Sequence, residues 1–239
     1  MSFPKVVVAG LALVAAQAQA GLLNFGDVVQ VGNQSGSVFT PSPVAGDANG
    51  WYLNTGIVVG SSSRSVYAGQ YVMDYSHDLS AGATTWQQFY SFCLEPDVNL
   101  QSFSNPYTVT GLSAAGYDAD AISELWGRYY GSINNDLSAA AFQIALWELA
   151  FESASSTSLS AGAFRLSSTA GAYSLASSWL ASLDGTGPRA YNLAVLVDNQ
   201  GDKYDRQDLI VQIPVPVPAT VALFGLGLVG LAASRRSRR

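Results

Sequence analysis

The sequence is poor in the residues that most catalytic and metal sites need. Its 239 residues include one cysteine, Cys93, and one histidine, His77, and charged residues make up only 12%. One histidine excludes sites built from several histidines, and one cysteine excludes zinc clusters and any disulfide within the chain. The phosphate-binding pattern Gly-x-x-x-x-Gly-Lys-Ser/Thr does not occur. We therefore expect no metal, no cofactor and no enzyme with turnover.

The first 20 residues have the organisation of a secretory signal peptide. Lys5 supplies the positive charge before an apolar run from Val6 to Ala16, and Ala18-Gln19-Ala20 forms a small-x-small cleavage site. We expect cleavage before Gly21, so that the mature chain lies outside the cytoplasm.

The other end of the chain, 214–239, predicts a membrane segment with a basic end. The uncharged span 219–233 follows a proline-rich stretch, and residues 234–239 contain four arginines. At 1.5 Å per residue a helix of this span measures roughly 22 Å, less than the roughly 30 Å hydrocarbon core of a bilayer. Such a short segment favours a temporary anchor in the inner membrane, with the arginines on the cytoplasmic side.

Pro216, Val217 and Pro218 stand directly before the apolar span. The order of prolines, apolar span and arginines resembles the PEP-CTERM sorting signal of exopolysaccharide-producing Gram-negative bacteria, which has glutamate where this chain has Val217. The resemblance implies an exosortase-type processing enzyme as partner. It also implies an exported protein in the cell envelope or the extracellular matrix.

Between the two signals, the body 21–213 is acidic and apolar enough for a packed domain. Without Lys5 and the four terminal arginines, six basic residues remain against 17 acidic ones, a formal net charge of −11. This charge disfavours nucleic acids and anionic lipids as partners. The whole chain is 49% hydrophobic and 11% aromatic, which excludes a disordered polar spacer.

The pattern of apolar residues in the body predicts an α+β fold. Short runs rich in β-branched and aromatic residues, separated by Gly, Ser and Asn, predict strands. These runs are 28–31, 38–40, 51–59, 66–75, 84–94, 193–197 and 207–213. Apolar residues at helical spacing predict helices that follow the N-cap residues Asp118 and Asp136 and a third helix over 171–183. We expect a β-sandwich or a barrel-like sheet with a helical insertion.

The lone cysteine lies at the end of the aromatic run 84–94. With a period of two, Cys93 shares its face of the strand with Phe89 and Ser91. Both faces are largely apolar, so the strand is expected to be central and Cys93 poorly exposed. In an oxidising compartment such a thiol is expected to be buried, joined to another chain or chemically committed.

Two glutamines on otherwise apolar faces are candidate partners for the thiol. Gln143 lies opposite Glu148 and Glu152, which we expect to define the wet side of the second helix. Gln207 alternates with apolar residues of the last strand, whereas Gln212 lies on its other face. An unpaired buried amide costs about 1 to 3 kcal/mol. One chemical solution is attack by a cysteine thiol on the amide carbonyl, which expels ammonia and leaves an internal thioester.

The order of these residues resembles the thioester domains of bacterial surface adhesins. Phe92-Cys93-Leu94 matches an aromatic-Cys motif at a strand end, and the run 142–147 matches the helix motif Thr-Gln-x-Ala-Ile/Val-Trp at its Gln, Ala and Trp positions. The family's late motif is apolar-Gln-x-x-apolar. The run 206–210 fits it from Gln207 onward, and the run 211–215 fits it literally with Gln212.

The resemblance implies that Cys93 supplies the thiol and Gln207 the acyl group, with Gln212 and Gln143 as alternatives. A thioester is an activated acyl group that must be kept from water, yet open to one incoming nucleophile. The residues implied to orient or shield the bond are Gln143, Trp147, Phe92 and Tyr90.

Three functions remain open at this point. The first is covalent attachment of an exported surface or matrix protein to an amine or a hydroxyl on a partner surface through the thioester. The second is a non-reactive structural protein of the biofilm matrix that binds exopolysaccharide through its sheet and aromatic surfaces. The third, an enzyme acting on glycans, needs two inward-facing carboxyl groups that the sequence does not show.

Overall fold

The computed structural model describes residues 22–32, 50–100, 106–152, 156–167, 171–190, 192–198 and 206–214. The predicted signal peptide, the predicted strand 38–40 and the tail beyond Pro214 lie outside these residues. All elements described below belong to one compact unit, Leu23–Ile213. Within the described ranges, no helix has the length and the apolar character needed to cross a membrane.

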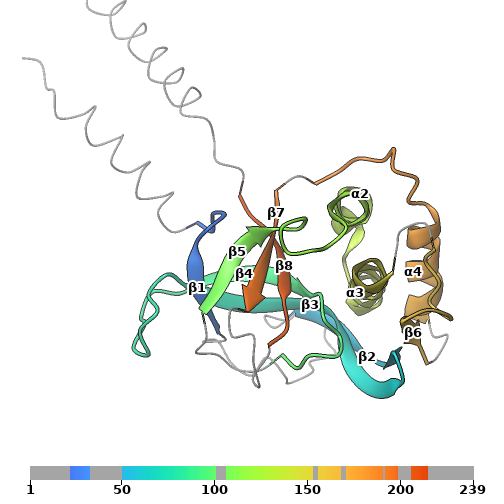
Figure 1. Cartoon of the computed structure of the whole chain (residues 1–239), viewed down its shortest axis with the longest axis horizontal. Helices are drawn as coiled ribbons and strands as arrows, with labels where there is room; N and C mark the ends of the chain where they lie inside the picture. Colours follow the sequence, from blue (N-terminus) through green and yellow to red (C-terminus); the bar gives the residue numbers. More distant parts are fainter. Residues whose placement is uncertain are drawn as a thin grey trace, which may run out of the picture. The chain divides into compact units, whose positions relative to one another are not determined.

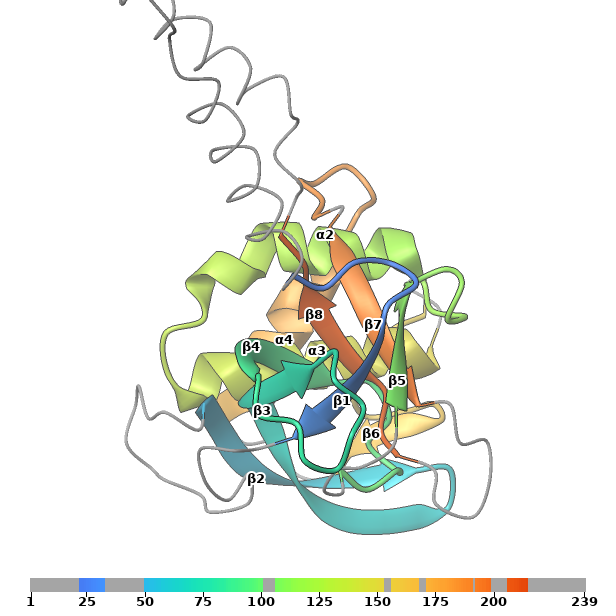
Figure 2. The same cartoon turned by 90° about the vertical axis from the view of Figure 1, so that its left-hand side faces the viewer.

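Six strands close into an antiparallel barrel. They are β1 (Val28–Gly32), β3 (Ser62–Ser76), β4 (Gln87–Cys93), β5 (Pro106–Gly111), β7 (Leu193–Asp198) and β8 (Leu209–Gln212). Neighbours pair in the order β1-β5-β7-β8-β4-β3, and β1 also pairs with β3, which closes the ring (Figures 1 and 2). Closure removes the unpaired edge strands that an open sheet would expose. The expected barrel-like sheet is therefore confirmed, and the sandwich alternative is wrong.

Two further strands, β2 (Gly50–Val59) and β6 (Phe164–Leu166), extend the sheet beyond β3. β2 pairs with β3 along its whole length, and β6 pairs with the end of β2. The strand β3 thus belongs to the barrel at one end and to this extension at the other. On its second edge β3 pairs with β4 only from Tyr71 to Tyr75, so the two strands separate before Tyr71.

The helical insertion lies between β5 and β7 in the sequence. It contains α2 (Ala119–Tyr129), the 3₁₀ turn η1 (Tyr130–Ser132), α3 (Asp136–Phe151) and α4 (Gly171–Ala181). As predicted, Asp118 caps α2, because its carboxylate accepts a hydrogen bond from the backbone N–H of Ala121. The N-cap of α3 is Asn135 and not Asp136. The Asn135 side chain accepts from the Ser138 N–H, and the Ser138 hydroxyl accepts from the Asn135 N–H.

The helix α3 is enclosed on both sides. It contacts β2, β3 and β4 on one side and α2 and α4 on the other (Figure 1). The small side chains of Ala139, Ala140 and Ala141 are at most 1% exposed, which allows this close packing. Glu148 is fully buried as well, so the prediction that it lies on a wet side of the helix is wrong.

Candidate functional site

Cys93 ends β4 with its sulfur in the protein interior. The residue is 3% exposed and its thiol is free, which confirms the predicted low exposure. Burial raises the pKa of the thiol, and the negative charge of Glu95 raises it further. The sulfur therefore stays protonated. A buried, protonated thiol is expected both for a cysteine that only fills the core and for one that reacts with a neighbouring group. The side chains around Cys93 therefore decide between the two.

The side-chain amide of Gln143 binds the backbone of Cys93. Its Oε1 accepts from the Cys93 N–H at 2.9 Å, and its Nε2 donates to the Cys93 carbonyl at 2.6 Å. These backbone groups point away from β8, because the adjacent N–H, that of Leu94, donates to the Asp208 carbonyl on the β8 side. They face the side on which β3 no longer pairs with β4 beyond Ser91. The side-chain amide of Gln143 thus makes the two hydrogen bonds to Cys93 that the backbone of a β3 residue would make if the ladder continued.

Gln207 precedes β8 and reaches the chain just after Cys93. Its Nε2 donates to the backbone carbonyl of Glu95, and the Asp208 N–H donates to the Glu95 carboxylate at 2.7 Å. Cys93 pairs with Leu209 in the ladder, which makes Gln207 its diagonal neighbour. In a regular antiparallel ladder such neighbours are about 7 to 8 Å apart and share a face. Gln207 lies two residues before β8 begins, and continuation of this register would bring the predicted thiol and the predicted acyl donor to one side of the sheet.

Cys93 and Gln207 line the same cavity, which has a volume of about 410 Å³. One wall is the segment of β3 from Ser62 to Tyr67, and the other contains Pro96 and residues 98–100. The cavity thus occupies the gap that opens where β3 separates from β4. Trp147 of α3 also lines it.

The aromatic residues next to Cys93 in the sequence do not lie in this cavity. Phe92 points to the other side of β4, where its ring centroid is 5.8 Å from that of Trp126 and 4.9 Å from that of Phe142. Phe92 therefore anchors β4 to the helices and does not cover the sulfur. Tyr90 is 54% exposed, so the prediction that it shields the bond is wrong. The aromatic residues that do line the cavity are Tyr67, Tyr71 and Trp147.

Tyr71 is one of the cavity residues that the sequence did not identify, and the ladder places it close to Cys93. It pairs with Ser91 in the β3–β4 ladder, and Ser91 shares a strand face with Cys93. Its hydroxyl donates to the Tyr67 carbonyl at 2.6 Å, and burial raises its pKa. Only the register between β3 and β4 reveals this neighbour, and no local pattern gives that register.

The two alternative glutamines are engaged elsewhere. Gln212 accepts from the indole N–H of Trp126 at 3.2 Å and donates to the side chain of Asn192 at 3.2 Å. It is exposed and does not line the cavity of Cys93. Both polar atoms of the Gln143 amide are bound to the backbone of Cys93. Of the three candidates, Gln207 is the one whose side chain borders the cavity.

His77 lies apart from the residues that border the cavity. Its Nε2 is 3.1 Å from a carboxylate oxygen of Asp27, and it does not line the cavity of Cys93. In the part of the chain that the structure describes, no group of three or more His, Cys, Asp or Glu side chains is arranged to hold a metal ion.

Comparison with known proteins identifies the tail. Residues 214–239 match the PEP-CTERM protein-sorting motif. Pro216, Val217 and Pro218 fall inside the matched segment, so valine in place of the family's glutamate is compatible with the match. No curated protein and no solved structure matches the chain. The motif indicates an exported protein that an exosortase processes and that is sorted to the cell envelope.

Proposed function

We propose that this exported protein attaches covalently to a partner surface through an internal thioester between Cys93 and Gln207. The observation that supports this most strongly is that both side chains line one cavity at the end of the β4–β8 ladder. Two further contacts support it. Gln143 fixes the backbone of Cys93, and the carbonyl of Glu95 holds the amide nitrogen of Gln207.

Thioester formation exchanges nitrogen for sulfur on the side-chain carbonyl carbon of Gln207. The Cys93 sulfur attacks this carbon, the C–N bond breaks, and ammonia leaves with the thiol proton. The Glu95 carbonyl binds the departing nitrogen, so the amide is oriented before the attack. Burial keeps the resting Cys93 thiol protonated, so the thiol proton is available to leave with the departing nitrogen.

Attachment to the partner breaks the new bond. An incoming amine or hydroxyl attacks the same carbonyl carbon, the C–S bond breaks, and Cys93 recovers a proton as a thiol. The product is an amide or an ester that joins position 207 to the partner. Nothing restores the glutamine amide afterwards, so each molecule reacts once and the protein is not an enzyme with turnover.

The burial of the site supports a bond that survives in water. Cys93 and Gln207 are 3% and 5% exposed, and Trp147 is 1% exposed. On the opposite wall of the cavity, Ser62 and Ser63 are exposed to solvent. This arrangement keeps the acyl carbon dry and leaves an approach for one nucleophile.

The sorting motif is consistent with attachment outside the cell. We place segment 219–233 in the inner membrane before processing, with 234–239 in the cytoplasm and the mature chain beginning at Gly21. After processing by the exosortase, the body reaches the envelope or the extracellular matrix. Surface ligands and exopolysaccharide are the partners available there.

Accurate mass of the purified exported protein tests the thioester. The wild-type protein is expected to weigh one ammonia less than its sequence, whereas C93A and Q207A are expected to show their full sequence masses. Q212A serves as a matched control and is expected to keep the deficit. A wild-type protein of full mass, with a free thiol that can be titrated after denaturation, would contradict the proposal.

The second candidate is a non-reactive matrix protein that binds polysaccharide. It is favoured by the serine and tyrosine side chains of the cavity. This function predicts reversible binding of oligosaccharides to a protein of full mass, and C93A would bind as well as the wild-type protein does.

A further inference from the structure

The cavity of Cys93 carries an unusual distribution of charge. Among the described residues that line it, Arg64 is the only one with a charged side chain. Its guanidinium donates to the backbone carbonyls of Pro96 and Asp97, at 3.4 Å and 2.6 Å. These bonds hold the positive charge between the two walls of the cavity. They do not neutralise it, since carbonyl oxygens carry no net charge.

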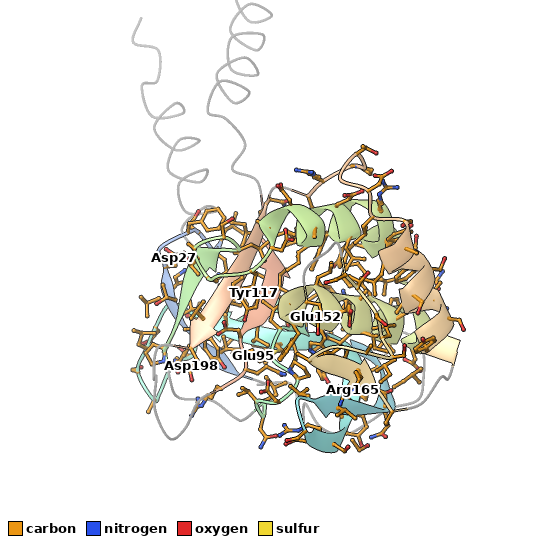
Figure 3. The ribbon with its side chains drawn as sticks, turned by 45° about the vertical axis from the view of Figure 1, so that its right-hand side comes forward. Asp27, Glu95, Tyr117, Glu152, Arg165 and Asp198 are labelled. Carbon is orange, nitrogen blue, oxygen red and sulfur yellow. The ribbon has the colours of Figure 1, made fainter. Side chains whose placement is uncertain are left out.

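Two nearby carboxylates, those of Glu95 and Asp208, have partners that do not line the cavity. The Glu95 carboxylate accepts from the Asp208 N–H. The Asp208 carboxylate accepts from the Tyr117 hydroxyl at 3.1 Å, and burial together with the charges of Asp208, Glu95 and Asp97 raises the pKa of Tyr117. Tyr117 does not line the cavity. Figure 3 shows Glu95 and Tyr117 on the side of the barrel where β7 and β8 lie. Glu95 and Asp208 thus make these contacts outside the residues that line the cavity, although the charge of Glu95 is close enough to raise the pKa of Cys93. Among the described lining residues, the charged side chain is that of Arg64.

The uncharged lining of the cavity combines hydroxyl groups with aromatic rings. Ser62, Ser63 and Ser65 supply hydroxyls along one wall. Tyr67 is 37% exposed, and its ring lies 5.6 Å from that of Tyr52, which in turn stacks on Tyr71 at 5.8 Å. Aromatic faces beside hydrogen-bonding groups match the chemistry of a sugar, whose C–H groups pack on rings while its hydroxyls bind polar atoms.

We infer that the acceptor of the acyl group is a hydroxyl of a neutral or anionic saccharide chain, so that the covalent product is an ester. The inference rests on the proposed function, because it names the substrate class of the same thioester. A lysine ammonium would meet the charge of Arg64, find no carboxylate among the lining residues, and have to lose its proton before attack. A hydroxyl needs no prior charge change, and an anionic sugar is attracted by Arg64.

The proton balance of this step uses groups that are present in the cavity. The hydroxyl oxygen attacks the side-chain carbonyl carbon at position 207 and the C–S bond breaks. The hydroxyl proton passes to the departing sulfur, which becomes a thiol. Burial, which raises the pKa of Cys93, makes this sulfur a strong base as it leaves. No histidine is needed as a base, in keeping with the position of His77 away from the cavity lining.

A competition experiment tests the acceptor. The exported protein is incubated at neutral pH with equal concentrations of Nα-acetyl-lysine, a neutral oligosaccharide and an oligouronate, and covalent adducts are quantified by mass. We expect saccharide adducts to exceed the lysine adduct at least tenfold and to be cleaved by hydroxylamine, which breaks esters and leaves amides intact. Faster reaction with lysine, while the ammonia deficit is present, would overturn the inference and leave the proposed function standing. Absence of the deficit would overturn both.

Charge reversal at the cavity provides a second readout. R64E is expected to lose the oligouronate adduct and to gain the lysine adduct, whereas R64Q is expected only to lose the preference for the oligouronate over the neutral sugar. The matched control is R165E on β6, whose side chain does not line the cavity. An R64Q protein that keeps the ammonia deficit and the unchanged preference for oligouronate would contradict the role of Arg64, even if R64E fails to fold.

Discussion

Gln143 binds both backbone polar groups of Cys93 with a single side-chain amide, at 2.9 Å to the N–H and 2.6 Å to the carbonyl. A buried strand end normally leaves such groups to a neighbouring strand or to water. Here β3 has already separated, and the helix α3 supplies the missing partner. The relationship links the helix motif and the cysteine motif, which lie 50 residues apart in the sequence.

Replacing Gln143 by leucine is expected to destabilise the protein and to reduce thioester formation. The leucine keeps the volume but leaves the N–H and the carbonyl of Cys93 buried without partners, at a cost of about 1 to 3 kcal/mol for each group. Urea denaturation measures the loss of stability, and intact mass measures the fraction of protein with the ammonia deficit.

The matched control for this substitution is Q212L. Gln212 is exposed, and water can replace its bonds to Trp126 and Asn192. We expect a change within about 1 kcal/mol, as for a typical exposed hydrogen bond. If Q143L and Q212L lowered stability equally, Gln143 would not be a partner that Cys93 depends on.

Much of the fold follows from local patterns in the sequence, whereas its closure does not. Runs of β-branched and aromatic residues predicted β2 and most of β3, and apolar residues at helical spacing predicted the helices α2 and α4. The pairing of β1 with β3 closes the barrel, and it depends on register between strands far apart in the chain. The helical pattern failed at Glu148, since α3 packs against the sheet on one side and other helices on the other.

The burial of Cys93 and the hydrogen bonding of Gln143 could be predicted, because each residue type is found in a protein interior under few conditions. A lone cysteine on a strand with two apolar faces is expected to be buried, and Cys93 is. A glutamine on an apolar helix face needs partners, and Gln143 has them. The cover over the sulfur was not predictable. Both faces of β4 are apolar, so sequence alone did not show that Phe92 faces the helices and Tyr71 the cavity.

Glu148 is expected to make the stability of the protein depend on pH. Burial raises the pKa of Glu148 from 4.5 to about 7, and this effect outweighs the hydrogen bond from the Ser158 N–H, which lowers the pKa. The folded protein then keeps a proton that the unfolded chain has lost, so stability falls as the pH rises from about 4.5 to about 7 and then levels off. E148Q stays neutral and keeps an acceptor for Ser158. The difference between the urea midpoints of E148Q and the wild-type protein is therefore expected to shift in favour of E148Q as the pH rises from about 4.5 to about 7. Midpoints of the two proteins that change in parallel with pH would contradict the raised pKa of Glu148.

Glu124 is expected to act in the opposite direction. Burial alone would raise its pKa, but the bond to Arg128 and the backbone N–H groups of Gly187, Asp184 and Gly185 outweigh it and lower the pKa. This stabilisation is present above the ordinary pKa of 4.5 and is lost as the pH falls through the lower folded value. E124Q should be less stable than the wild-type protein at neutral pH, and the gap should narrow in acid. A gap that stays constant down to about pH 3 would contradict this account, because the unfolded carboxyl is by then protonated.

Gly69 is expected to be required for the close contact of β2 and β3. A Cβ at this position would collide with the backbone of Trp51 and Tyr52. Because these are main-chain atoms of a paired strand, G69A is expected to lower stability by about 1 to 3 kcal/mol or more. The control is G111A on β5, where a Cβ meets nothing within 4 Å. Thermal melting of the two variants should separate them clearly, and a G69A melting point equal to that of G111A would contradict the clash.

Trp147 is expected to protect the thioester from water. It is 1% exposed and lines the cavity together with Cys93 and Gln207. W147L would leave a void beside the acyl carbon that is large enough to admit water, so hydrolysis should accelerate. The measurement is a time course of intact mass at neutral pH. The species that lacks one ammonia should convert to one with a carboxylate at position 207, several times faster than in the wild-type protein.

The control for Trp147 must remove the same volume from the core without opening the cavity. Trp126 meets this need, because it is 3% exposed and packs on Phe92, on the opposite side of β4. Since a Trp-to-Leu change removes similar packing in both variants, general loosening of the protein would shorten the lifetime of the bond equally. A shorter thioester lifetime in W147L alone would show that the wall of the cavity keeps water from the bond. An equally shortened thioester lifetime in W126L would show that the rigidity of the whole core protects the bond.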